Sequence, residues 1–254
     1  MTTTFAPGTP SWVDLGTTDL AAAGAFYAAL FGWTVDDLGP DAGGYGFLRK
    51  DGKMVAGIGP ATDPGRGTSW SIYFATEDAD AAAARVSANG GTVVMAPMDV
   101  MDQGRMAVLQ DPAGAYFSVW QPGEHRGAEL VNTAGGMCWV ELMTTDVAAA
   151  KTFYDAVLGT SSRDVDLGDG NSYTLFEVSG ASVAGAMGMG GDPSGPRWSV
   201  YFAVDDCDAV ADAALKQGAS EMARDDSPAG RLAFLVDPQG GQFCILKPNP
   251  DFSM

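Results

Sequence analysis

Basic residues and histidine are scarce in this sequence. Fourteen Lys and Arg stand against 32 Asp and Glu, there is a single histidine, and the formal net charge at pH 7 is −18. Nucleic-acid binding needs clustered Lys and Arg to neutralise phosphates, so the composition argues against a nucleic-acid partner. It also argues against an anionic membrane surface. No apolar run reaches the ~18 residues of a membrane helix, so no membrane partner is expected.

Cysteine is nearly absent as well. The three cysteines, Cys138, Cys207 and Cys244, show no metal-type spacing and do not suggest a disulfide framework. Residues 1–10 lack the basic start and apolar stretch of a signal peptide. A reducing, cytoplasmic location is therefore the expectation.

The second half of the sequence repeats the first. SWVDLGTTDLAAAGAFYAALFGW (11–33) returns as CWVELMTTDVAAAKTFYDAVLG (138–159). Further on, GRMAVLQDPAGAYF (104–117) returns as GRLAFLVDPQGGQF (230–243). A period this long indicates a duplicated domain rather than a solenoid repeat. We predict one domain at 1–122, a linker at 123–136 and a second domain at 137–254.

Each copy divides again into two halves with one element order. The alternating run 12–15 predicts a strand, and Thr18-Asp19 predicts the N-cap of an Ala-rich helix at 21–30. The remaining elements expected in the first copy are strands at 45–48 and 54–58, then a strand at 70–75, a helix at 78–88, a strand at 92–95 and a hairpin of 106–109 with 116–120. The unit is β-α-β-β-β, the chain holds four, and the fold class is α+β.

Taken together, these motifs resemble the vicinal oxygen chelate superfamily, the glyoxalase, bleomycin-resistance and extradiol-dioxygenase group. The resemblance rests on the four β-α-β-β-β units, on T-D followed by F-Y seven or eight residues later, and on the D-P-x-G hairpin. Within the superfamily, the sequence most resembles the tandem subgroup that is often labelled glyoxalase-like or hydroxylase. The resemblance implies two glyoxalase-type domains whose curled sheets enclose a small-molecule cleft.

The metal ligands of that superfamily have no counterparts here. Metal-using members carry cleft-facing His and Glu on the opening and last strands of the units. The matching positions here are Trp12, Trp139, Ser71, Ser199, Ser118 and Cys244, with no ligand near Gly57 or Gly185. A catalytic divalent site needs about three N, O or S ligands. We therefore expect neither a metal nor another cofactor.

Two carboxylates are the candidate acid/base groups. Strand alternation turns Asp14 and Glu141 the same way as the neighbouring Trp12 and Trp139, away from the apolar face of the strand. An indole beside a carboxylate should raise its pKa and suit it to proton transfer or to ligand binding. The alternative is a salt bridge or a capped turn between units. The tryptophans could stack on a flat ligand or fill the position of the missing metal.

The other candidate ligand-binding residues recur in both copies. They are Tyr45 and Tyr173, Tyr73 and Tyr201, Ser71 and Ser199, Ser118 and Cys244, and Arg105 and Arg231. The arginines could pair with Asp14 and Glu141, bind a ligand carboxylate, or lie on the surface. The serines have no neighbouring histidine, which excludes a Ser-His-Asp nucleophile. Trp70 and Trp198 lie on the same side of their predicted strands as the apolar residues that alternate with them, and they are therefore expected to be buried in the core.

Three functions remain open on the sequence. The first is metal-independent binding of a small, largely apolar or aromatic molecule in a cleft lined by Trp and Tyr. The second is a metal-free isomerase, lyase or hydroxylase-type enzyme that uses Asp14 or Glu141 as acid/base. The third is a non-catalytic interaction protein with plugged clefts. A homodimer is a further candidate assembly.

Overall fold

The fold consists of four β-α-β-β-β motifs in a row. The computed structural model describes residues 4–39, 42–63, 65–168 and 171–250. Motif one contains β1 (Pro10–Thr17), α1 (Leu20–Phe31), β2 (Thr34–Asp37), β3 (Gly46–Lys50) and β4 (Lys53–Pro60). Motif two contains β5 (Ser69–Ala75), α2 (Ala79–Ala88), β6 (Thr92–Val100), β7 (Gly104–Gln110) and β8 (Tyr116–Pro122). Motif three contains β9 (Met137–Thr144), α3 (Val147–Leu158), β10 (Ser161–Gly168), β11 (Asn171–Val178) and β12 (Ala181–Gly188). Motif four contains β13 (Arg197–Ala203), α4 (Cys207–Lys216), β14 (Ser220–Ser227), β15 (Gly230–Val236) and β16 (Gln242–Pro248).

Each copy supplies one eight-stranded sheet. The strand order is β2-β3-β4-β1-β5-β8-β7-β6 in the first copy and β10-β11-β12-β9-β13-β16-β15-β14 in the second. In each motif the opening strand runs parallel to the last strand, as β1 does to β4 and β9 to β12, while the other neighbours are antiparallel hairpins. The expected α+β class and the four β-α-β-β-β units are confirmed.

The predicted helix starts are also confirmed. Asp19 has extended backbone angles and accepts a hydrogen bond from Ala22 N, which satisfies one of the free N–H groups of the first turn. Asp146 caps α3 in the same way through Ala149 N. Helix α1 ends where Gly32 adopts φ 70°, a conformation that glycine takes without a steric penalty. None of the helices in the described residues is long and apolar enough to cross a membrane.

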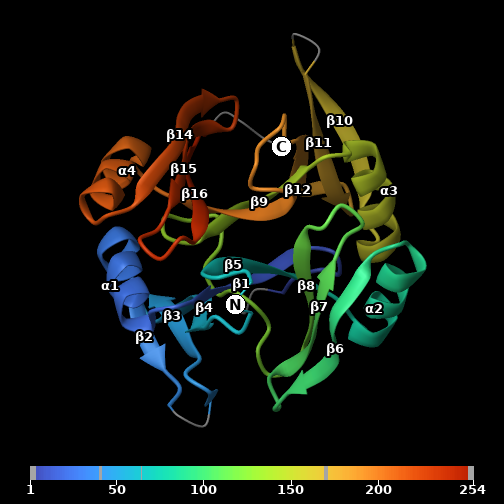
Figure 1. Ribbon diagram of the computed structural model, residues 1–254, viewed down its shortest axis with the longest axis horizontal. Coiled ribbons are helices and arrows are strands. Elements are labelled where there is room, and N and C mark those ends of the chain that lie inside the picture. Colours follow the sequence, from blue (N-terminus) through green and yellow to red (C-terminus); the bar gives the residue numbers. More distant parts are fainter. Residues whose placement is uncertain (1–3, 40–41, 64, 169–170, 251–254) are drawn as a thin grey trace. The chain divides into compact units, whose positions relative to one another are not determined.

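The compact packing units do not coincide with the two copies. One unit, here the terminal unit, comprises residues 12–71, 128–139 and 200–254, and so contains most of motifs one and four. The other, the central unit, comprises residues 1–11, 72–127 and 140–199, and so contains most of motifs two and three. Helices α2 and α3 lie side by side in the central unit (Figure 1). Each unit therefore draws one motif from each copy.

Aromatic side chains fill the core of each unit. In the terminal unit, Tyr27 packs edge-on against Trp70 and Phe243. In the central unit, Tyr154 packs the same way against Trp198 and Phe117. Trp70 and Trp198 are 6% and 7% exposed, which confirms their predicted core positions. Burial of this much aromatic surface is a main source of stability for such a domain.

The first edge strand differs from the prediction. The sequence analysis placed no strand at β2, and all four of its residues are exposed. An edge strand with no buried face has no apolar alternation to reveal it, and its acidic residues Asp36 and Asp37 discourage pairing with another chain.

Candidate functional site

A carboxylate, a phenol and an indole are joined in the terminal unit. Trp12 Nε1 donates a hydrogen bond to Tyr45 Oη at 3.2 Å, and Tyr45 Oη donates to Asp14 Oδ2 at 3.5 Å. Trp12 is 3% exposed, whereas Asp14 and Tyr45 are partly accessible. Burial raises the pKa of Tyr45 well above its usual value, and the nearby Asp14 carboxylate raises it further. The phenol therefore remains a hydrogen-bond donor at neutral pH.

The central unit contains the matching carboxylate and phenol. Tyr173 Oη donates to Glu141 Oε2 at 2.7 Å. Glu141 is buried at 6% exposure, and its strand also carries the buried Trp139. Glutamate is one methylene longer than aspartate, which accounts for the shorter bond in this copy. We call Asp14 with Tyr45, and Glu141 with Tyr173, the carboxylate–phenol pairs.

Two glycines make room for the phenols. Gly57 lies opposite Asp14 in the β1–β4 register, and Gly185 lies opposite Glu141 in the β9–β12 register. A Cβ added at Gly57 would lie 2.6 Å from Cζ of Tyr45 and would overlap its hydroxyl. A Cβ at Gly185 would meet the Tyr173 ring equally closely. The sequence analysis treated these positions only as missing ligands. Both the glycine and the tyrosine recur in the two copies, and this repetition was the sequence signal from which their contact could have been predicted.

The remaining predicted site residues lie on the inner strands of the second and fourth motifs. Tyr73 pairs with Ser118 across β5 and β8, and Tyr201 pairs with Cys244 across β13 and β16. All four are buried. Ser71 and Ser199 lie two residues earlier on β5 and β13, with Ser199 9% exposed and Ser71 slightly more accessible. The parallel registers thus bring each tyrosine beside another of the candidate residues, a pairing that the sequence analysis did not predict.

Of the alternatives left open for the two arginines, the structure shows ion pairs at the surface and not with Asp14 or Glu141. Arg105 Nε lies 2.8 Å from Asp80 Oδ2, and its Nη1 lies 2.9 Å from Asp99. Arg231 pairs with Asp208 and Asp226. Asp80 and Asp208 lie in the first turns of α2 and α4, where an acidic residue is favoured. Within the described residues these ion pairs account for both guanidinium groups, and they lie at the protein surface.

A buried network that the sequence analysis missed joins the two copies. In the terminal unit Tyr27 Oη donates to Asp237 Oδ2 at 2.9 Å and accepts from Trp70 Nε1 at 3.0 Å. In the central unit Tyr154 bonds Asp111 at 3.0 Å and accepts from Trp198 at 2.9 Å. The tyrosine belongs to the F-Y motif and the aspartate to the D-P-x-G turn of the other copy. In the sequence analysis these aspartates, Asp111 and Asp237, entered only as the first residue of the D-P-x-G hairpin motif.

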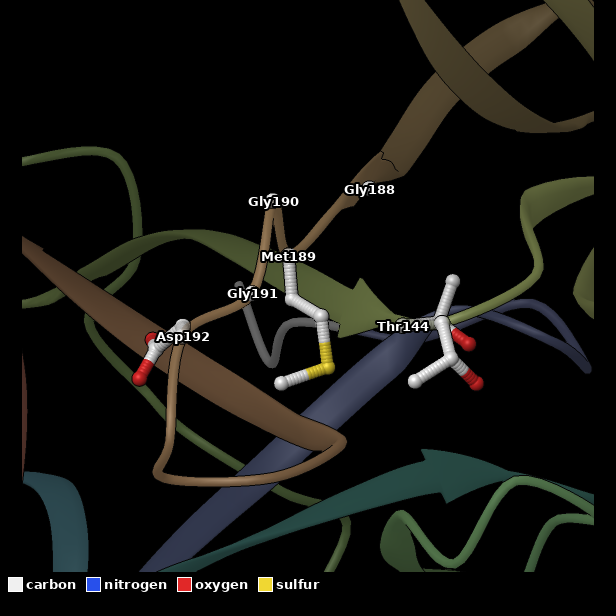
Figure 2. A pocket seen from close by; sticks show the side chains of 7 residues that line it. Thr144, Gly188, Met189, Gly190, Gly191 and Asp192 are labelled. Carbon is white, nitrogen blue, oxygen red and sulfur yellow. The ribbon is translucent and has the colours of Figure 1, made fainter.

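A surface hollow of about 400 Å³ lies in the central unit, at the carboxyl ends of β9 and β12. Its lining residues are Thr144, Thr145, Gly188, Met189, Gly190, Gly191 and Asp192. Figure 2 shows the loop that carries Met189 and the three glycines passing beside Thr144. This hollow was not predicted from the sequence.

Family models match both copies. Residues 9–119 match the glyoxalase/bleomycin resistance protein/dioxygenase superfamily, and residues 139–246 match the glyoxalase-like domain. The chain belongs to this superfamily.

Similar proteins match this chain over nearly its whole length. The anthracycline biosynthesis protein DnrV of Streptomyces peucetius is 44% identical over 96% of this chain and 95% of its own length. CFP32 of Mycobacterium tuberculosis (strain CDC 1551 / Oshkosh), which bears a glyoxylase name, is 41% identical over 97% of each chain. The Mn(II)-bound glyoxalase of Novosphingobium aromaticivorans has a TM-score of 0.64 at 18% identity, covering 98% of this chain and 86% of that one, and shows the same fold.

The described residues at the strand positions considered for metal ligands in this chain do not fit a divalent metal. Indole and aliphatic hydroxyl groups occupy the strand positions that would supply ligands, and the one thiol among them, Cys244, is buried. Within the described residues no group of three or more His, Cys, Asp or Glu converges to hold an ion. A catalytic site needs about three such ligands. We therefore derive no chemical step through a metal.

Proposed function

We propose that this protein binds a small, flat, largely apolar aromatic molecule through its carboxylate–phenol pairs and does so without a metal ion. The hydrogen-bonded chain Trp12–Tyr45–Asp14 carries this proposal. The partly accessible phenol of Tyr45 offers a stacking surface, and the carboxylate of Asp14 accepts a hydrogen bond from a ligand hydroxyl. Few polar groups on an apolar surface are typical of small-molecule sites.

The relatives indicate the kind of ligand. DnrV and DauV, at 44% and 42% identity, are both named anthracycline biosynthesis proteins. Anthracycline-type molecules are polycyclic aromatics with phenolic hydroxyl groups, which match an acceptor flanked by aromatic rings. We extend this ligand class to the present chain. A net charge of −18 disfavours anionic ligands such as nucleotides.

A second candidate is a metal-free enzyme of the same superfamily. The observation that favours it is the 2.7 Å bond between Tyr173 Oη and buried Glu141. Glu141 could take a proton from a carbon acid or phenol and return it to another position of the same molecule. Such an isomerisation consumes no oxidant or reductant. General acid/base help of this kind contributes about 100-fold or more to a rate.

The test measures affinity and folding on the same variants. Quinizarin, a dihydroxyanthraquinone, is titrated against the wild type, Asp14→Asn and Glu141→Gln while tryptophan fluorescence is followed, and each thermal midpoint is recorded. We expect saturable binding that weakens about tenfold or more when a carboxylate is lost, with the folded state retained. Lower thermal midpoints with unchanged affinity would assign the carboxylates a structural role only. Absence of quinizarin binding to the wild type would favour plugged sites and overturn the proposal.

A further inference from the structure

The hollow beside β9 and β12 owes its space to glycine. The two parallel strands end together, with Gly188 opposite Thr144, and Met189 N extends the pairing by a bond of 3.0 Å to Thr144 O. The chain then turns through Gly190 and Gly191, at φ 55° and 89°. A Cβ added at any of the three glycines would meet no atom within 4 Å. Their missing side chains leave the hollow open.

Hydrogen bonds hold the loop around this hollow in place. Asp192 N donates to Met189 O at 2.8 Å and closes the turn. The Asp192 carboxylate accepts from Ser194 N at 2.8 Å and from Arg197 Nη2 at 2.7 Å. The Ser194 N–H and the Arg197 guanidinium hold the pKa of Asp192 below its usual value, so the carboxylate stays ionised and bound to Arg197. Because the loop is already ordered, ligand binding does not carry the entropic cost of ordering the loop.

In the first copy a threonine hydroxyl accepts a hydrogen bond from the equivalent backbone N–H. There Thr18 N donates to Thr68 Oγ1 at 3.2 Å, and the two threonine hydroxyls lie 3.4 Å apart. Thr68 lies two residues before Trp70, and the residue two before Trp198 is Pro196. Proline has no hydroxyl, so Thr145, the counterpart of Thr18, lacks that partner. Gly190 and Gly191 likewise replace the larger Thr62 and Asp63.

We propose that this hollow binds a small neutral molecule that carries a carbonyl or hydroxyl oxygen on an apolar body. Thr145 lines the hollow and has an N–H and a hydroxyl that can donate to such an oxygen. Met189 offers an apolar, adaptable contact (Figure 2). A volume of about 400 Å³ suits a molecule of one or two rings. The Asp192 carboxylate is paired with Arg197 and so does not attract a cation, while the net charge of −18 disfavours anions.

This site is separate from the carboxylate–phenol pairs. Glu141 and Gly185 lie three residues before Thr144 and Gly188 along the same strands. Neither Tyr173 nor Glu141 lines the hollow. The inference therefore does not depend on the proposed function, and each can fail without the other.

The experiment follows the methionine methyl groups by NMR in protein labelled with ¹³C-methyl methionine. A Met189→Leu variant assigns the Met189 signal. Acetophenone, benzoate and benzylamine, which share one ring and differ in charge, are titrated in parallel. We expect a saturable shift of the Met189 signal with acetophenone and a weaker response to benzoate and benzylamine.

Gly188→Leu supplies the blocking variant, because its backbone φ is not positive and the new side chain enters open space. It should weaken acetophenone binding at least about tenfold without lowering the thermal midpoint. Pro60→Leu, at the matching position of the first copy, should leave binding unchanged. The proposal is overturned if acetophenone produces no saturable shift, if benzoate or benzylamine binds more tightly, or if Gly188→Leu binds like the wild type.

Discussion

The hydroxyl of Tyr27 bonds the carboxylate of Asp237, 210 residues away in the sequence, at 2.9 Å. Burial raises the pKa of Tyr27 well above its usual value, and the charge of Asp237 raises it further. Burial also raises the pKa of Asp237. Both groups are desolvated, so loss of either one removes this hydrogen bond from a buried polar atom of the other, Oη of Tyr27 or Oδ2 of Asp237. The mirrored bond between Tyr154 and Asp111 repeats this arrangement in the central unit.

Removal of the Tyr27 hydroxyl should destabilise the protein. Tyr27→Phe leaves Asp237 Oδ2 and Trp70 Nε1 without that partner, at a cost of about 1–3 kcal/mol in the free energy of unfolding. Urea unfolding of Tyr27→Phe, Asp237→Asn and the double variant measures the coupling between them. Strictly additive losses would show that the bond contributes nothing to stability.

Gly57 and Gly185 should not tolerate alanine. The added methyl group overlaps the phenol of Tyr45 or Tyr173 and displaces it from its carboxylate, with an expected destabilisation of about 1–3 kcal/mol. Gly188→Ala is the matched control, because its Cβ meets open space. Combining Gly57→Ala with Tyr45→Ala should recover part of the loss. Equal thermal midpoints for Gly57→Ala and Gly188→Ala would argue against the close contact.

Cys138 should be inert in the native protein. Burial raises the pKa of its thiol from 9.0 to about 12, so at pH 8 the reactive thiolate is nearly absent. Native protein should therefore resist iodoacetamide at this position, whereas urea-unfolded protein should react; mass spectrometry measures both. Fast native labelling of Cys138 at pH 8 would contradict this burial.

The same shift makes the folded protein lose stability in alkali, because the unfolded thiol ionises at a lower pH than the folded one. A thiol whose folded pKa is raised contributes stability that is complete below pH 9 and is lost as the pH rises toward 12. Cys138→Ser should remove this contribution. Serine can keep the local bond, since Ser11 Oγ donates to Tyr73 O as Cys138 Sγ does to Tyr201 O. Comparison of urea unfolding for the two proteins between pH 8 and 11 measures the difference.

Local patterns predicted the motifs but not their pairing. The caps Asp19 and Asp146 and the buried face of Val13 and Leu15 follow from neighbours in the sequence, and the structure confirms them. The partner of Tyr27 does not follow, because both copies contain a D-P-x-G aspartate of the same chemistry. Only tertiary packing selects Asp237 from the other copy.

The candidate site was predictable to a similar extent. Repetition in both copies identified Tyr45 and Asp14 as candidates, and the structure joins them by a hydrogen bond. Repetition also suggested Arg105, whose ion pairs lie elsewhere. A surface ion pair that recurs in a duplicated fold leaves the same sequence signal as a site residue. Asp80, an acidic residue in the first turn of α2, is the sequence feature that could have indicated the ion-pair partner of Arg105.

The central claim is metal-independent recognition of an aromatic molecule by the carboxylate–phenol pairs. The most direct measurement is calorimetric titration of quinizarin into chelator-treated protein whose metal content is checked by elemental analysis, with Tyr45→Phe and the surface variant Arg105→Ala in parallel. We predict saturable binding by metal-free wild type and Arg105→Ala, and weaker binding by Tyr45→Phe. Binding that appears only after a divalent metal is restored would contradict the account.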